Sequence, residues 1–259
     1  MPVDNGLYDR EAKTWWADGS FLSILRVAVN PVRLEYLRTF ESRLGLKPES
    51  LRVLDVGCGG GYLAEELVKL GFNVTGVDPS PGSIAAAQAH AKSNKLDVAY
   101  RVASAESLPF PDGSFDLVTC CDVLEHVASL DQTLKEISRM LRPGGVFMYD
   151  TINRNFMTWL AVIFVAQEFP PTRFFPPGTH DWHLFIRPEE LGTSLTRHGI
   201  SNQDIAGMTP SMNILHQFWL ILKLKYGRLD YREYGQRTRL HLSQNMMMNY
   251  IGYGIKNNG

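Results

Sequence analysis

Residues 53–61 read Val53-Leu54-Asp55-Val56-Gly57-Cys58-Gly59-Gly60-Gly61, an apolar run that ends in closely spaced glycines. The β-branched and aliphatic residues favour a buried strand, and the glycines favour a sharp turn into a following helix. Glycine has no Cβ, so such a turn lets the backbone approach a ligand more closely than other residues allow. A second apolar run closes with the acid Asp78. The pattern therefore predicts a strand–turn–helix unit whose loop binds a nucleoside cofactor.

The spacing of the glycines indicates which cofactor this loop binds. A dinucleotide loop has glycine at its first, third and sixth positions, whereas here Gly61 is fifth and Tyr62 is sixth. This arrangement is typical of class I methyltransferases that bind S-adenosylmethionine, which has no pyrophosphate for a helix N-terminus to hold. We therefore expect S-adenosylmethionine rather than a nicotinamide, with Asp55, Gly57 and Gly59 in its site.

Two positions further along the chain complete the expected cofactor site. The carboxylate of Asp78 can accept hydrogen bonds from both ribose hydroxyls, and the alternative is an acid in a solvent-facing turn. In a later loop, Ser104 stands where many methyltransferases carry an aspartate. We therefore expect Ala105 to contact the adenine through its main chain alone.

Strand and helix patterns alternate between residues 52 and 151, which is typical of a parallel sheet with helices on both faces. We expect an α/β fold with a doubly wound, mostly parallel seven-stranded sheet, Rossmann-like as in class I methyltransferases, with N-terminal helices and a lid insertion. The expected strands are 52–57, 73–78, 97–103, 115–120, 146–151, 200–208 and 247–255, and the expected helices are 30–44, 61–70, 80–94 and 130–141. The ligand should then lie at the carboxyl ends of the parallel strands.

Composition narrows the class of partner. The chain has 259 residues and a net charge of −1, so no broad basic surface indicates nucleic acid. Its three cysteines form neither a disulfide framework nor a C-x-x-C pair, which favours a reducing compartment. Residues 1–9 lack the pattern of a secretory signal, and no apolar run reaches the length of a membrane span. We expect a cytoplasmic protein, with peripheral membrane contact as an open alternative.

Motifs that span most of the chain give a resemblance to a known family. These are Tyr8-Asp9, Trp15-Trp16, Asn30-Pro31-Val32-Arg33-Leu34, the glycine loop 55–61, Val74-Thr75-Gly76-Val77-Asp78, residues 119–127, Asn153-Arg154-Asn155, Gly178-Thr179-His180-Asp181, Phe185-Ile186 and Asn249-Tyr250. With them the chain resembles the ubiquinone-biosynthesis O-methyltransferases, which include 3-demethylubiquinol and polyprenyldihydroxybenzoate O-methyltransferases. The glycine loop names only the superfamily, whereas the paired tryptophans and the Asn-Pro-x-Arg and Gly-Thr-His-Asp motifs are much narrower.

The resemblance implies which residues bind the cofactor. Carried over from the family, these are Arg33, Gly57, Asp78 and Cys121. Arg33 would hold the methionine carboxylate with the two-pronged guanidinium, and the alternative is an ordinary arginine on a helix surface.

The resemblance also implies a divalent cation such as Mg²⁺. The family's Glu-x-x-Glu-His cluster reads here as Asp122, Glu125 and His126, with a shorter first ligand. Two carboxylates and an imidazole spaced in this way suit an octahedral Mg²⁺ or a zinc-like ion. The alternative is that the motif merely lines the pocket, as in methyltransferases without a metal.

Methyl transfer asks for a deprotonated oxygen held in line with the carbon–sulfur bond of the donor. A histidine near neutrality can assist the acidic hydroxyl of a catechol, and the candidates are His126 and, next to Asp181, His180. We therefore predict an S-adenosylmethionine-dependent O-methyltransferase acting on a small aromatic or quinol-like acceptor. The alternative acceptor is another phenolic, enolic or carboxylic metabolite.

Two segments bear on the acceptor. Residues 156–177 combine an apolar stretch with a Pro- and Phe-rich loop, which suits either an interfacial helix under a lipophilic acceptor or a lid over the site. Residues 212–245 form a longer connection than the family has, and could cover the pocket mouth or make a dimer or membrane contact. We expect a single domain: a helical cap (1–48), a cofactor-binding core (49–152), a lid and helix (153–199), and the last strands with the insertion (200–259). A nicotinamide oxidoreductase and a catalytically silent scaffold remain as rivals.

Overall fold

The computed structural model describes residues 6–17 and 19–258, without the side chains of Leu7, Tyr8 and Ile214. The first five residues of the expected cap and the Tyr8 side chain of the first motif therefore lie outside the described part.

Within these residues, eight strands form one sheet in the order β3-β2-β1-β4-β5-β8-β6-β7. The strands are β1 (Arg52–Val56), β2 (Asn73–Asp78), β3 (Val98–Val102), β4 (Phe115–Cys121), β5 (Leu141–Ile152), β6 (Ile200–Pro210), β7 (Leu240–Ser243) and β8 (Asn249–Lys256). Strands β3, β2, β1, β4 and β5 are parallel, whereas β8 runs antiparallel between β5 and β6, and β7 is antiparallel to β6. The α/β, mostly parallel prediction is confirmed, but the predicted count of seven strands was one too low.

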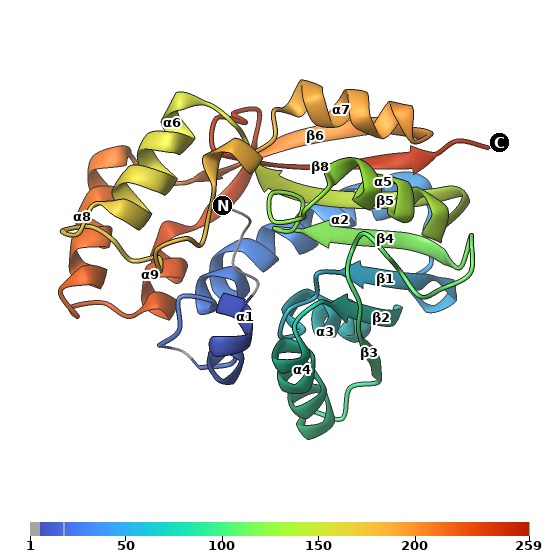
Figure 1. Cartoon of the computed structure of the whole chain (residues 1–259), viewed down its shortest axis with the longest axis horizontal. Helices are drawn as coiled ribbons and strands as arrows, with labels where there is room; N and C mark the ends of the chain where they lie inside the picture. The colour runs from blue at the N-terminus through green and yellow to red at the C-terminus, as the bar shows by residue number, and fades with distance from the viewer. Residues whose placement is uncertain (1–5, 18, 259) are drawn as a thin grey trace.

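Helices connect and cover this sheet (Figure 1). They are α1 (Gly6–Arg10), α2 (Asn30–Leu44), α3 (Tyr62–Lys69), α4 (Pro81–Ser93), α5 (Leu130–Met140), α6 (Phe156–Thr158), α7 (Pro188–Arg197), α8 (Ile214–Lys225) and α9 (Tyr231–Thr238), with the short or irregular helical segments η1 (Ala12–Thr14), η2 (Leu25–Val29), η3 (Pro48–Ser50), η4 (Trp159–Glu168) and η5 (Trp182–Leu184). Helix starts follow capping rules: the Ser80 hydroxyl accepts a hydrogen bond from the Ser83 amide at the start of α4, and Pro81 occupies the first turn.

The two faces of the sheet each bury a separate apolar core, because successive side chains of a strand point to opposite faces. Val53 of β1 packs with α2, α3 and α4, whereas its neighbour Leu54 packs with α5 and α7. In β4, Leu117 belongs to the same core as Val53, and Val118 belongs to the same core as Leu54. This two-sided burial explains why the central strands are continuous apolar runs.

Two elements differ from the sequence-based expectation. Strand β5 begins at Leu141, before the expected start at residue 146, and includes the Pro143-Gly144-Gly145 stretch. The pairing of β5 with β4 shifts in register at this stretch. The segment 212–245 is not an open loop: it forms α8, α9 and the edge strand β7.

The parallel strands end toward the side of the molecule where α1, α6, α8 and α9 gather (Figure 1). The N-terminal cap, the segment after β5 and the insertion therefore all lie at the carboxyl edge of the sheet, where an open α/β sheet binds its ligand.

Candidate active site

The glycine loop follows β1 and turns against β2. The amides of Gly57 and Cys58 both donate to the Val77 carbonyl, at 2.8 and 2.9 Å. Gly57, Gly59 and Gly61 have φ values of +71°, +51° and +90°, which L side chains rarely adopt. The sequence-based prediction of a tight, glycine-dependent turn therefore describes this loop correctly.

Close neighbours also require glycine here. A Cβ on Gly57 would lie 2.2 Å from a methyl of Val123, in the loop after β4. A Cβ on Gly59 would lie 2.4 Å from the Trp15 ring. The loop is thus enclosed by the end of β4 on one side and by the N-terminal cap on another.

Asp78 ends β2 beside this loop and is almost buried. Its Oδ2 accepts from the Gly59 amide and its Oδ1 from the Ser80 amide, both at 2.9 Å. Burial raises the pKa of Asp78 to about 6, against the lowering effect of these hydrogen bonds. The carboxylate is fixed by backbone and keeps acceptor capacity for a ligand.

Asp55, in β1, is also buried, at 2% exposure. Its Oδ1 accepts from the Thr119 hydroxyl at 2.7 Å, whereas its Oδ2 has no hydrogen-bond partner among the described residues. Burial raises the pKa of Asp55 to about 6. A buried oxygen without a partner is costly unless a ligand satisfies it, so Asp55 fits the ammonium of a bound amino-acid group.

Arg33, in α2, is buried and not on the helix surface. Its Nε and Nη2 bind the carboxylate of Asp150 at 2.7 and 2.9 Å, and Nη2 also binds Asp122 at 2.5 Å. Its Nη1 donates to Asn30 at 3.1 Å. Burial lowers the pKa of Arg33, but Asp150 and Asp122 outweigh that effect, so its pKa is raised. The guanidinium therefore places positive charge at the ends of β4 and β5.

The predicted metal set does not come together. Among residues 6–17 and 19–258, no group of three or more His, Cys, Asp and Glu could hold a metal ion. Asp122 is engaged by Arg33, and a carboxylate oxygen of Glu125 accepts from the Thr151 hydroxyl at 2.6 Å. Burial, with a contribution from Asp122, raises the pKa of Glu125. These side chains do not fit the implied cation.

The two candidate histidines do lie together. The rings of His126 and His180 have centroids 5.5 Å apart, although 53 residues separate them, from 126 to 180. Burial lowers the pKa of His126 to about 4, and burial with the His126 ring lowers that of His180 to about 3. Both rings are therefore uncharged at neutral pH, and the expectation of a histidine with a pKa near neutrality is wrong, because burial disfavours the charged imidazolium. Asp181 caps η5, where its side chain accepts a hydrogen bond from the His183 amide at 2.9 Å.

The remaining candidates lie where the chain turns at the same edge. Cys121 is the last residue of β4 and is buried beside Arg33 and Asp150, the charges that most affect its thiol after burial. Ala105 lies in the loop after β3, also buried.

Three contributors were not singled out as site residues from the sequence. Trp15 covers Gly59 and Gly60, and its indole N–H donates to the Ser83 hydroxyl at 3.0 Å. Asp150, at the end of an apolar run like Asp78, orients Arg33. The Gln167 side chain bonds both the amide and the carbonyl of His180, at 2.8 and 3.2 Å. An acid at the end of an apolar run was a usable signal for Asp150, whereas nothing local marks Gln167.

The fold and the loop geometry define a class I, S-adenosylmethionine-dependent methyltransferase. The methyltransferase domain family matches residues 54–149. Among solved structures, the chain is similar to a SAM-dependent methyltransferase from Thermotoga maritima (19% identity, TM-score 0.65, 97% of this chain and 99% of that one). It is also similar to magnesium protoporphyrin IX methyltransferase from Synechocystis PCC 6803 with bound S-adenosylhomocysteine (17% identity, TM-score 0.63, 98% and 96%). At these identities the likeness shows the fold.

Sequence relatives identify the family. The chain is 38% identical to a ubiquinone biosynthesis O-methyltransferase from Rhizobium leguminosarum bv. trifolii, over 85% of this chain and 90% of that protein. It is 35% identical to one from Paramagnetospirillum magneticum, over 98% and 94%. The chain belongs to the ubiquinone biosynthesis O-methyltransferase family.

Proposed function

We propose that this chain transfers the methyl group of S-adenosylmethionine to a hydroxyl of a small aromatic or quinol-like acceptor. The observation that carries the proposal is the pair of uncharged histidine rings, 5.5 Å apart, beside the loop that follows β4. Val123 of that loop meets Gly57, and His126 follows Val123 by three residues, so His126 is close in the chain to the wall of the cofactor loop.

The cofactor is assigned to the loop and the strand-end acids. Asp78 accepts from the ribose hydroxyls, and Asp55 accepts from the methionine ammonium through its unpartnered Oδ2. Gly57 and Gly59 give the backbone its close approach, with Cys121 and the main chain of Ala105 on the remaining sides. Arg33 Nη1, which has two hydrogens and one bond to Asn30, can donate once more, to the methionine carboxylate.

The histidines act on the acceptor. When bound, S-adenosylmethionine supplies a methyl on a positively charged sulfur. His126 accepts the hydroxyl proton of the acceptor as the oxygen–carbon bond forms and the carbon–sulfur bond breaks, leaving S-adenosylhomocysteine and the methyl ether. His180 Nδ1, which is buried and has no hydrogen-bond partner among the described residues, orients the same hydroxyl. Because the side chains of Asp122 and Glu125 are otherwise engaged, this mechanism uses no cation.

A methyl-transfer screen tests this function. Catechols and prenylated dihydroxybenzoates are incubated with enzyme and S-adenosylmethionine, and the added methyl is read by mass. We expect His126→Gln to lower kcat by roughly 10²-fold or more with little change in the affinity for S-adenosylmethionine. The matched control is His198→Gln, because His198 bonds Asp131 at 2.9 Å on α5, away from the site. Equal activity of His126→Gln and wild type would show that His126 is not the general base.

The second candidate acceptor is a different phenolic, enolic or carboxylic metabolite. The insertion favours it, since α8 and α9 add pocket walls where the family that the sequence resembles has only a short connection.

We also propose that the four segments 1–48, 49–152, 153–199 and 200–259 act as one domain. The contacts of Trp15 with the glycine loop and of Arg33 with Asp150 support this proposal.

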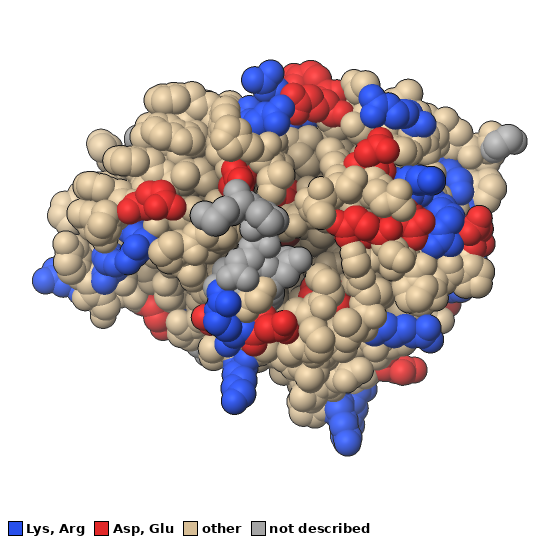
Figure 2. Space-filling view, viewed as in Figure 1, with Lys and Arg blue, Asp and Glu red and all other residues tan. Residues whose placement is uncertain are grey.

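We further propose peripheral contact with a membrane through residues 156–177. Phe156, Trp159, Phe164 and Phe169 are 39–66% exposed, and each ring stacks on the next at 5.4–6.1 Å. Residues other than Lys, Arg, Asp and Glu predominate over α6 on the face in Figure 2. None of the helices in the described chain is long and apolar enough to cross a membrane. Co-sedimentation with anionic vesicles, lost in Phe156→Ser/Trp159→Ser, supports this contact, and unchanged sedimentation refutes it.

A further inference from the structure

Gln167 is a buried polar side chain near the end of η4, at 3% exposure. Its Oε1 accepts a hydrogen bond from the His180 amide at 2.8 Å, and its Nε2 donates to the His180 carbonyl at 3.2 Å. Nε2 also donates to the Glu168 carboxylate at 2.9 Å. One side-chain amide therefore satisfies both main-chain polar groups of His180, as the opposite residue of an antiparallel pair does.

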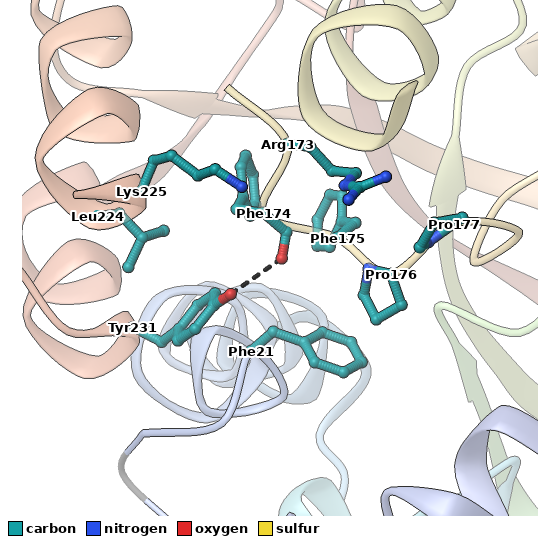
Figure 3. A pocket seen from close by; sticks show the side chains of 9 residues that line it. All are labelled: Phe21, Arg173, Phe174, Phe175, Pro176, Pro177, Leu224, Lys225 and Tyr231. Atoms are coloured by element: carbon teal, nitrogen blue, oxygen red, sulfur yellow. Dashed lines mark hydrogen bonds between the residues drawn. The ribbon is translucent and has the colours of Figure 1, made fainter. Parts of the chain in front are cut away.

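His180 needs such support, because its stretch of chain has no regular structure. Residues 169–181, which are all described, form neither helix nor strand. The first part of this loop is held at Phe174, whose amide donates to a main-chain carbonyl of η4 at 3.0 Å and whose carbonyl accepts from the Tyr231 hydroxyl at 2.9 Å (Figure 3). Gln167 holds the last part of the loop to the same segment, η4.

The placement of His180 matters because its ring lies beside the group assigned as the base. The ring centroid is 5.5 Å from that of His126 and 5.2 Å from that of Phe175. The imidazole leaves the chain at the Cα between the amide and the carbonyl that Gln167 binds. A shift of this main chain would therefore turn the ring away from His126, and a misplacement of about 1 Å can cost about 100-fold in rate.

We propose that Gln167 is a positioning residue for methyl transfer: it fixes the main chain of His180 so that the imidazole stays beside His126 and the acceptor hydroxyl. This proposal rests on the proposed role of His180 in O-methyl transfer. Gln167 acts through His180 alone, so the loss of its amide should have no further effect in a protein without that imidazole. A side chain that only stabilises the fold would lower activity equally with and without it.

A double-mutant comparison tests this dependence. Gln167→Met keeps the length of the side chain but removes its hydrogen bonds, and we expect it to lower kcat for catechol methylation roughly tenfold, with an unchanged KM for S-adenosylmethionine. In the His180→Gln protein the same substitution should change kcat by less than about twofold. Equal losses in both backgrounds, or no loss when His180 is present, would overturn the proposal.

The matched control is Thr172→Val. Thr172 is 1% exposed, and its hydroxyl donates to the Val165 carbonyl at 2.6 Å, so it also joins the loop to η4 but does not bond His180. We expect both Thr172→Val and Gln167→Met to lower the melting temperature, but only Gln167→Met to lower kcat. An equal loss of kcat in Thr172→Val would assign the effect to the stability of the loop and overturn the proposal.

Nuclear magnetic resonance of the histidine rings adds a measurement that needs no turnover. The His180 signal, identified by its loss in His180→Gln, depends on the neighbouring rings of Phe175 and His126. With S-adenosylhomocysteine bound, we expect this signal to shift in Gln167→Met and to stay in place in Thr172→Val. An unchanged signal in Gln167→Met would overturn the proposal. Full activity of His180→Gln would overturn the proposed role of His180 and this proposal with it, whereas a large loss in His180→Gln with normal kcat in Gln167→Met would overturn this proposal alone.

Discussion

The guanidinium of Arg33 binds the carboxylate of Asp150 side by side, with Nε–Oδ2 at 2.7 Å and Nη2–Oδ1 at 2.9 Å. Arg33 is 4% exposed and Asp150 is 0% exposed, so this bidentate pair is inside the protein. It joins α2 to the end of β5, and through Asp122 to the end of β4. The pair therefore holds together the strand ends that form the cofactor side of the site.

Removing the arginine should destabilise the fold. Arg33→Met leaves the carboxylates of Asp150 and Asp122 buried without their cation, and we expect a loss of about 3–5 kcal/mol in the free energy of unfolding. Urea denaturation measures it. The control is Arg52→Met, because the Arg52 side chain is 55% exposed in its pair with Asp116 at 3.5 Å, and Asp116 keeps its pair with Arg142, so the loss should be less than about 1 kcal/mol. Similar losses in the two variants would show that the buried pair does not stabilise the strand ends.

The cap over the glycine loop predicts a second effect. In Gly59→Ala the new Cβ would collide with the Trp15 ring at 2.4 Å, in addition to the strain of φ +51°. Gly45→Ala provides the control, since Gly45 has φ +62° with nothing within 4 Å and reports the strain alone, about 1 kcal/mol. We expect Gly59→Ala to lower the melting temperature more than Gly45→Ala and to shift the tryptophan fluorescence. Identical behaviour of the two variants would mean that Trp15 does not cover the loop.

How much the sequence predicts depends on whether a signal is local. The glycines of the turn, Gly57 to Gly61, are two residues apart directly after an apolar run, and Asp78 closes a second apolar run. Both signals are local, so these positions could be predicted from the sequence. The edge strand β7 is only four residues long and is fixed by pairing with β6, which no local pattern encodes. The Glu-x-x-Glu-His resemblance suggested a metal, but Arg33, which is 89 residues from Asp122, engages that carboxylate. Long-range pairing of charges decides such a site, and spacing alone does not reveal it.

The engaged carboxylates predict how activity responds to chelation. Since Asp122 binds Arg33 and the Glu125 carboxyl bonds the Thr151 hydroxyl, we expect EDTA to leave methyl transfer unchanged, within about twofold. Initial rates are compared after dialysis against EDTA and after addition of Mg²⁺. Loss of activity that Mg²⁺ restores would show that the Arg33–Asp122 pair opens to admit a cation.

The raised pKa of Asp78 predicts opposite effects of pH on cofactor affinity and on stability. Its carboxylate must be ionised to accept from both ribose hydroxyls, so with a pKa of about 6 the affinity for S-adenosylmethionine should weaken as pH falls from 7 to 5. Without cofactor, the folded protein holds this proton above the ordinary value of 3.8, so the free energy of unfolding should decrease as pH rises through the window from 3.8 to 6.

Asp78→Asn should remove both of these dependences and weaken S-adenosylmethionine binding roughly tenfold or more, because an amide has a single acceptor oxygen. Asp55→Asn is the matched variant, since Asp55 also has a pKa of about 6 but would meet the ammonium and not the ribose. Adenosine, which has the ribose but no amino-acid group, separates the two in a calorimetric titration at pH 5 and pH 7. We expect its affinity to depend on pH in wild type and in Asp55→Asn but not in Asp78→Asn, and a pH dependence that persists in Asp78→Asn would assign the ribose to another residue.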